Sequence, residues 1–198
     1  MSKYPHTSTD GISAKDRMKI YDKRPNTFQY IRQVIRYGFT LTCFRELIYL
    51  FLYYIINHVK GISKAHLGKG VRIWPTALLR DAERIYIGAG SSINHNNILW
   101  AGRKSAVIRI GKNVMFGPNV TILAYNHYIE DGVVLPEHFS EEDIVIGDNV
   151  WIGAGVIILA GAKIGEGSVV GAGSVVTGEL PSHSVCVGVP AKPVRQIE

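Results

Sequence analysis

The chain has 198 residues, of which 46% are hydrophobic and 19% are charged. This size and composition suit one buried core with an appendage, and the 21 glycines have no Gly-X-Y period, which excludes collagen. The two cysteines, Cys43 and Cys186, are too few for a disulfide framework, and no C-x-x-C pair favours zinc or redox chemistry. We therefore expect a reducing, cytoplasmic compartment.

The charge is unevenly distributed along the chain. Residues 1–80 carry 14 Lys+Arg against 4 Asp+Glu, whereas residues 81–198 carry 8 against 12. The basic part is either a solvated surface or a region attracted to an anionic membrane or a phosphorylated substrate. No recognisable nucleic-acid-binding motif is present, so we do not expect nucleic acid as a partner.

The N-terminal third differs from the rest in pattern. Residues 1–26 are polar and lack the apolar core of a signal peptide, so we expect a loose arm or a short helix. The run 47–56 (LIYLFLYYII) would form a helix of about 15 Å, half a bilayer core. Two interpretations remain open: this helix packs on the protein or a partner subunit, or it makes peripheral contact with the inner face of a membrane through residues 27–60.

From about Val71 onward, an aliphatic residue recurs every six positions. The unbroken part of this grid consists of Ile146, Ile152, Ile158, Ile164, Val170 and Val176. A period of six fits neither a helix nor an alternating strand. It predicts an all-β parallel β-helix in which three units close a triangular coil and roughly five coils stack. We expect this β-helix over residues 63–187, after a helical segment within residues 1–62 and before a tail at 188–198.

The grid is interrupted between Ile122 and Ile146. We interpret residues 128–143, which include Pro136, as a loop extruded from the β-helix directly after His127. Long loops in compact repeat folds are usually functional, so the base of this loop is the first place to look for a site.

Four stretches share their pattern with a known family. They are 113–122 leading to His127, 146–153 (IGDNVWIG), 170–177 (VGAGSVVT) and 188–194 (GVPAKPV). On these stretches residues 85–198 resemble the hexapeptide-repeat acyltransferases, in the sugar O-acetyltransferase branch that includes galactoside, maltose and nodulation-factor acetyltransferases. The resemblance implies a left-handed coil and acetyl coenzyme A as the acyl donor.

His127 matches the catalytic position of that family. Acyl transfer to an alcohol needs a base, and an imidazole can take the hydroxyl proton near neutral pH. The family also implies an oxyanion donor at the backbone near Ala154. No third histidine lies at short spacing from His127 and His138, so we expect no metal.

The resemblance also indicates binding residues. Asn94 matches the acceptor-binding asparagine, and Trp100 is a candidate sugar platform. The stretch 99–106 is basic and longer than in the family, which usually has an acidic residue there, so an anionic or aromatic-stacked sugar is favoured over a simple galactoside. The residues expected at the cofactor are Trp151, Ala154, Ala172, Thr177, Lys192 and Arg195. Gly178 stands where relatives often have a lysine, so we expect one phosphate contact fewer.

The function predicted from these observations is acetyl-CoA-dependent O-acetylation of a saccharide in bacterial surface polysaccharide or glycan biosynthesis. The family implies a homotrimer with active sites between subunits. Two alternatives remain open: N-acetylation of an amino-sugar nucleotide and a non-catalytic assembly role. A zinc hydratase on the same scaffold is disfavoured by the histidine spacing.

Overall fold

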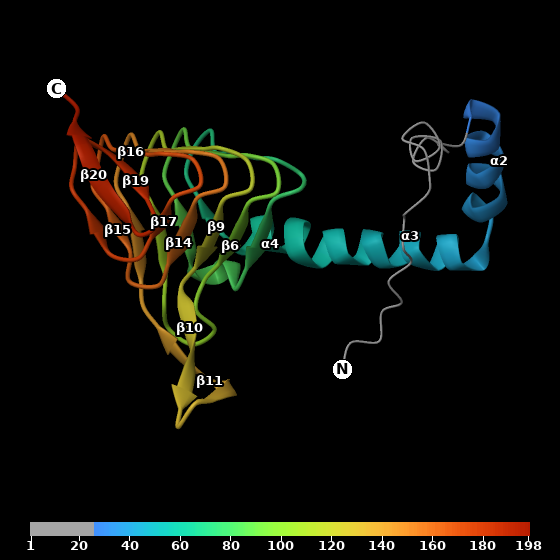
Figure 1. The fold of residues 1–198 in the computed structure, drawn as a ribbon, viewed down its shortest axis with the longest axis horizontal. Coiled ribbons are helices and arrows are strands. Elements are labelled where there is room, and N and C mark those ends of the chain that lie inside the picture. Colours follow the sequence, from blue (N-terminus) through green and yellow to red (C-terminus); the bar gives the residue numbers. More distant parts are fainter. Residues whose placement is uncertain (1–25) are drawn as a thin grey trace, which may run out of the picture. The chain divides into compact units, whose positions relative to one another are not determined.

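A computed structural model describes residues 26–198 of the chain (Figure 1). It divides into two compact units, Met1–Leu50 and Phe51–Glu198, and the predicted polar arm lies almost wholly outside the described residues.

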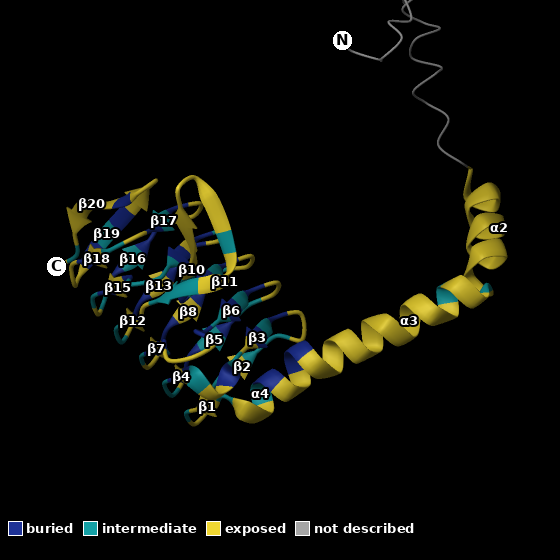
Figure 2. Cartoon of the chain, turned by 90° about the horizontal axis from the view of Figure 1, so that it is seen from below, coloured by how far each residue is buried: buried dark blue, intermediate teal, exposed yellow. Residues whose placement is uncertain are grey.

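The described part of the first unit is helical. Helix α2 spans Thr27–Gly38 and begins with a capping box, in which the Asn26 side chain accepts from the Gln29 N–H at 2.8 Å and the Gln29 side chain accepts from the Asn26 N–H at 3.1 Å. Helix α3 spans Leu41–Tyr54, and neither helix has a buried residue (Figure 2). The predicted N-terminal helical segment is therefore confirmed, and α2 and α3 are its two long helices.

The second unit begins within α3 and continues through a π-helical turn, Ile55–Val59, into α4, Lys60–Lys64. These turns pack on the first coil of the β-helix. The His58 ring is buried, and its Nδ1 donates a hydrogen bond of 2.7 Å to the Ala77 carbonyl. Gly61 is also buried, and a Cβ at this position would lie 2.6 Å from the Leu79 carbonyl oxygen. The close approach of helix and coil thus requires glycine here.

The rest of the second unit is a parallel β-helix with three sheets. The first sheet contains β1 (His66–Leu67), β4 (Ile85–Ile87), β7 (Ile108–Ile110), β12 (Ile144–Ile146), β15 (Lys163–Ile164) and β18 (Glu179–Leu180). The second contains β2 (Arg72–Ile73), β5 (Ser92–Ile93), β8 (Met115–Phe116), β13 (Trp151–Ile152), β16 (Val169–Val170), β19 (Ser184–Gly188) and β20 (Ala191–Gln196). The third contains β3 (Leu78–Arg80), β6 (Ile98–Trp100), β9 (Thr121–Leu123), β14 (Ile157–Leu159) and β17 (Val175–Val176).

These strands form five complete coils and a partial sixth that contains β18 and β19. Strand β20 pairs antiparallel with β19 and covers the last edge of the second sheet. The predicted fold class is confirmed, and the β-helix extends slightly beyond the roughly five coils expected.

The six-residue grid is the core of the β-helix. Its members pair in register with residues one coil away, as in Ile146 with Ile164 and Ile152 with Val170. They are 0–3% exposed, and burial of each such side chain contributes about 1.5–3 kcal/mol. The core is dark blue inside the coils in Figure 2.

Three departures from the 18-residue coil stack at one corner, where the third sheet leads into the first. A 3-10 turn, Ala82–Arg84, lies between β3 and β4. Residues 101–106 form a longer loop between β6 and β7, within the stretch 99–106 that is longer in this sequence than in the family it resembles. A hairpin lies between β9 and β12. We call this corner the insertion corner.

The segment expected to be extruded, residues 128–143, lies mostly within this hairpin. Strands β10 (Tyr125–Glu130) and β11 (Val133–Glu141) pair antiparallel and project from the coils (Figure 1). Asp131 and Gly132 connect them, both with positive φ (48° and 77°). A two-residue Asp-Gly turn between β-forming residues is a strong hairpin signal, and this one can be recognised in the sequence.

Candidate active site

The candidate catalytic base lies in the hairpin at the insertion corner. His127 is exposed on β10, opposite Phe139 of β11, with ring centroids 4.9 Å apart. The Tyr125 ring lies edge-on at 6.0 Å. Within residues 26–198 the imidazole has no hydrogen bond or ion pair, so its nitrogens are open to a ligand. The sequence predicted His127 at the base of the extruded segment, and the structure places it within strand β10 of the hairpin.

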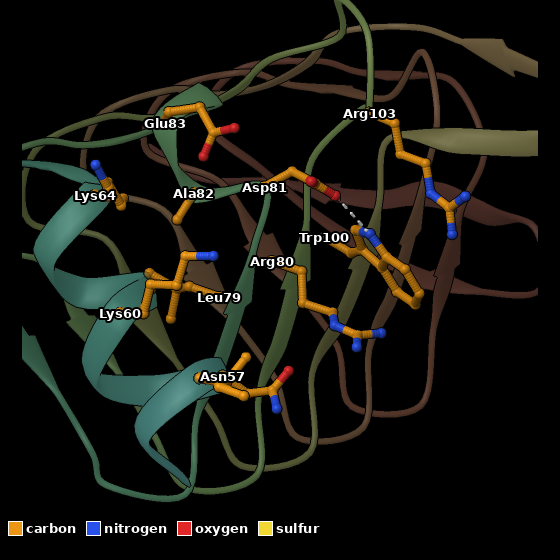
Figure 3. Close-up of a pocket in the computed structure, with 12 residues that line it drawn as sticks. Asn57, Lys60, Lys64, Leu79, Arg80, Asp81, Ala82, Glu83, Trp100 and Arg103 are labelled. Carbon is orange, nitrogen blue, oxygen red and sulfur yellow. Dashed lines mark hydrogen bonds between the residues drawn. The ribbon is translucent and has the colours of Figure 1, made fainter. Parts of the chain in front are cut away.

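Trp100 is the second predicted site residue at this corner. Its Nε1 donates to Asp81 Oδ2 at 2.9 Å, shown by the dashed line in Figure 3. The Arg80 guanidinium lies over the indole, 4.4 Å from the ring centroid, and the Tyr125 ring meets it edge-on at 5.2 Å. Trp100 and His127 therefore contact the same tyrosine. Burial raises the pKa of Tyr125, against the lowering effect of Arg103 and Arg80.

A carboxylate fastens the hairpin to the loop 101–106. Glu141, at the end of β11, accepts from the backbone N–H groups of Lys104 at 3.0 Å, Ser105 at 2.8 Å and Ala106 at 3.2 Å. Burial raises the pKa of Glu141, but the backbone donors outweigh it and lower the pKa to about 2. Glu141 is thus ionised at neutral pH. Its partners are more than 30 positions away, so no local pattern pointed to it.

Arg84 holds the same loop from the other side. Its Nε donates to the Gly102 carbonyl at 2.5 Å and its Nη2 donates to the Arg103 carbonyl at 2.8 Å. The loop that carries Arg103 is therefore held at both ends, by a carboxylate of the hairpin and a guanidinium of the 3-10 turn.

Asn94 lies at a different corner from His127. It follows β5, where the second sheet leads into the third, and its Oδ1 accepts from the His95 N–H at 2.7 Å. Ala154 and Ala172 follow β13 and β16 at that same corner, and the Gly173 N–H donates to the Ala154 carbonyl at 2.9 Å. Asn94, Ala154 and Ala172 therefore form a column, which we call the acceptor–cofactor column.

The other predicted cofactor residues are spread over the surface. Trp151 points outward from β13 and is 52% exposed. Thr177 is exposed after β17 on the insertion corner, and Lys192 and Arg195 are exposed on β20. Within one copy of the chain, Trp100 and His127 therefore lie at the same corner. The acceptor–cofactor column lies at a different corner of that copy.

The backbone at Ala154 suits an anion. Its N–H donates to no acceptor among residues 26–198, whereas the Gly153 and Gly155 amides bond to the Val170 and Pro118 carbonyls. Ala154 is exposed, so this donor is available to a ligand. An open backbone N–H is the kind of group that stabilises an oxyanion.

Comparisons with known proteins agree with this architecture. The bacterial transferase hexapeptide family (six repeats) matches residues 143–178. Galactoside O-acetyltransferase of Escherichia coli K12 is 34% identical over 67% of this chain and 64% of its own length. The chain spans 45–64% of the length of the curated relatives it matches.

Two solved structures are similar over more of their length. A hexapeptide-repeat acetyltransferase from Vibrio cholerae is 30% identical, covers 70% of this chain and 77% of its own, and has a TM-score of 0.60. That protein was also solved in complex with acetyl coenzyme A. A maltose O-acetyltransferase from Clostridium difficile is 36% identical over 67% of this chain and 70% of its own, with a TM-score of 0.59.

The three stacked parallel sheets define a hexapeptide-repeat β-helix. The chain belongs to the hexapeptide-repeat acetyltransferase family, which confirms the resemblance drawn from the sequence.

Proposed function

We propose that the chain is an acetyl-CoA-dependent O-acetyltransferase that acts on a saccharide hydroxyl, with His127 as the general base. The observation that carries this proposal is the open imidazole of His127 on the hairpin of a family member. In the reaction, the imidazole takes the hydroxyl proton as the oxygen attacks the thioester carbonyl. The carbon–sulfur bond then breaks, and the imidazolium returns the proton to the departing thiolate, leaving an acetyl ester and coenzyme A.

The unpartnered Ala154 N–H supports a role in binding the oxyanion of the tetrahedral intermediate. The small side chains of Ala154 and Ala172 leave space for a pantetheine arm along the backbone. Trp151 and Thr177 are exposed for contact with the donor. Lys192 and Arg195 would supply positive charge to its phosphates.

The separation of His127 from the acceptor–cofactor column favours a site shared between copies. A neighbouring copy that presents Asn94 and Ala154 to His127 would complete the groove, and a closed ring of three would make three such grooves. We therefore include a homotrimer in the proposal.

The biological setting belongs to the proposal as well. A basic N-terminal half and exposed apolar helices suit an enzyme of bacterial surface polysaccharide or glycan biosynthesis that works in the cytoplasm, on the inner face of the membrane.

The test is an acceptor panel. Plain sugars and amino sugars, free and as nucleotide derivatives, are incubated with acetyl-CoA, and free thiol release is measured for the wild type and His127→Ala. Release with plain sugars, lost in the variant, supports the proposal. Release confined to amino sugars would identify an N-acetyltransferase. No release and no acetyl-CoA binding by calorimetry would favour an assembly role.

A further inference from the structure

A pocket of about 320 Å³ opens between the helical turns 56–64 and the first two coils (Figure 3). The polar residues that line it and carry the argument are Asn57, Lys60, Lys64, Arg80, Trp100 and Arg103. Three come from the helical turns and three from the insertion corner, all within the second unit. The pocket therefore adjoins the candidate active site.

The pocket has unneutralised positive charge. Its two acids are engaged elsewhere: Asp81 lies 3.9 Å and Glu83 lies 3.8 Å from Arg84, and Asp81 also accepts from Trp100. The four cations are Lys60, Lys64, Arg80 and Arg103, and none of them has an ion-pair partner in the described part of the chain. A concave site with uncompensated cations attracts anions.

The two arginines are held in place by aromatic rings. Arg80 lies over Trp100 at 4.4 Å and Arg103 over Phe139 at 4.8 Å from the ring centroid. Neither guanidinium donates a hydrogen bond within residues 26–198. A guanidinium stacked on a ring keeps its planar edge of N–H donors open, which is the geometry that binds a carboxylate or phosphate with two parallel bonds.

The same rings connect the arginines to the base. Trp100 meets Tyr125 at 5.2 Å, and Phe139 meets His127 at 4.9 Å. An anionic group held by Arg80 and Arg103 would therefore lie near the His127 imidazole. A short saccharide could place its charged group at the arginines and a hydroxyl at the imidazole.

We infer that the acceptor is an anionic saccharide, and that Arg80 and Arg103, with Lys60 and Lys64, bind its carboxylate or phosphate. This inference rests on the proposed function, because it identifies the pocket as part of the same acceptor site. It also gives Trp100 a specific task, which is to position Arg80.

The test compares matched sugars by calorimetry without acetyl-CoA. For the gluco, galacto and manno series, the neutral methyl glycoside, the methyl uronate glycoside and the sugar 1-phosphate are titrated into the full chain. We expect an anionic member of at least one series to bind tenfold or more tighter than its neutral partner, with affinity falling as salt rises. The uronate and phosphate arms distinguish the two sources of charge.

The variants are Arg80→Gln, Arg103→Gln and Lys60→Gln, with Lys112→Gln at another corner as the matched control. We expect each arginine variant to reduce the preference for the anionic member about tenfold, Lys60→Gln to reduce it less, and the control to retain it. Equal binding of charged and neutral sugars, or no anionic binding in any series, would overturn the inference. Thiol release is measured separately, so anion binding without transfer would count against the proposed function alone.

A second inference comes from the exposed helices. Large apolar side chains along α2, α3 and the turn between them face solvent, with Phe39 of the turn 89% exposed, Leu41 83% and Phe28 75%. No single helix among the described residues is long and apolar enough to span a membrane, although the bent pair Thr27–Gly38 and Leu41–Lys64 passes on length and composition together. So large an apolar surface requires a partner.

The charges indicate which partner. Residues 26–56 contain Arg32, Arg36 and Arg45, and their one acid, Glu46, is bound to Arg45 at 3.0 Å. Helix α2 has no acid at all and is strongly amphipathic. A basic amphipathic helix beside an apolar one has the charge and hydrophobicity that suit an anionic bilayer surface.

We propose that α2 and α3 dock on an anionic membrane. The test is flotation of the full chain with phosphatidylcholine vesicles, with or without phosphatidylglycerol. We expect flotation that requires the anionic lipid, falls with salt, and drops several-fold in the double variant Arg32→Gln/Arg36→Gln but not in Lys112→Gln. Absence of flotation, or flotation equal on neutral vesicles, would overturn the proposal. A larger assembly that Phe28→Ser and Ile31→Ser dissociate, without flotation, would identify a second copy as the partner.

Discussion

Glu141 offers a quantitative test of how the insertion corner is held. The substitution Glu141→Gln removes the charge that the backbone N–H groups of Lys104, Ser105 and Ala106 stabilise. A pKa of about 2 in place of the ordinary 4.5 corresponds to about 3 kcal/mol of folding free energy, which solvent screening on the open side reduces to about 2 kcal/mol. We expect the free energy of unfolding at pH 7 to fall by that amount in the variant.

The contribution of Glu141 to the free energy of unfolding should decrease as the pH falls. Because the folded-state pKa of Glu141 is depressed, its contribution is fully present above about pH 4.5 and is lost as pH falls toward about 2. Urea unfolding followed by circular dichroism from pH 7 to pH 3 should therefore show the gap between wild type and variant narrowing below pH 4.5. Glu137→Gln, on the same strand with no hydrogen bond among the described residues, is the control. A gap at pH 7 no larger than that of the control, or one independent of pH, would refute the reasoning.

Three further predictions concern the base, the shared site and the first coil. His127→Ala should lower turnover by about a hundredfold or more with unchanged circular dichroism, and activity within tenfold of wild type would remove it from the role. Ala172→Trp should block the donor groove and abolish thiol release. When this variant and His127→Ala are refolded together in equal amounts, about a quarter of wild-type thiol release should return if each site is shared between two copies. No release should return if each site lies within one chain. Gly61→Ala should lower the free energy of unfolding by about 1–3 kcal/mol in urea titrations because its Cβ would meet Leu79, whereas Gly38→Ala, whose Cβ meets nothing, should not; equal effects would contradict this packing argument.

The regular coils could be predicted from the sequence because their energetics repeat. Each inward Ile or Val of the grid packs on apolar neighbours one coil away, so the period in the sequence becomes a register between coils, as between Ile158 and Val176. The broken grid predicts that the segment 128–143 leaves the coils, but it does not predict the antiparallel pairing within it, for which the signal is the Asp131–Gly132 turn.

The insertion corner could be predicted only in part. His127 and Trp100 were found from the resemblance and from residue type, and the structure brings both to Tyr125. The clamp of the loop 101–106 by Glu141, and the pairing of two arginines with aromatic rings, depend on contacts between separate coils. Such contacts leave no trace in local spacing, and they needed the three-dimensional arrangement.

Because the three insertions share one corner, the segments that can vary are separate from the segments that form the core. The buried aliphatic residues inside the coils provide most of the stabilising core. The 3-10 turn, the loop 101–106 and the hairpin lie outside this core. A lineage can therefore lengthen, shorten or recharge these appendages without disturbing the scaffold that supports them. For the same reason, a different loop could be grafted between β6 and β7 to change what this corner binds, while the β-helix stays intact.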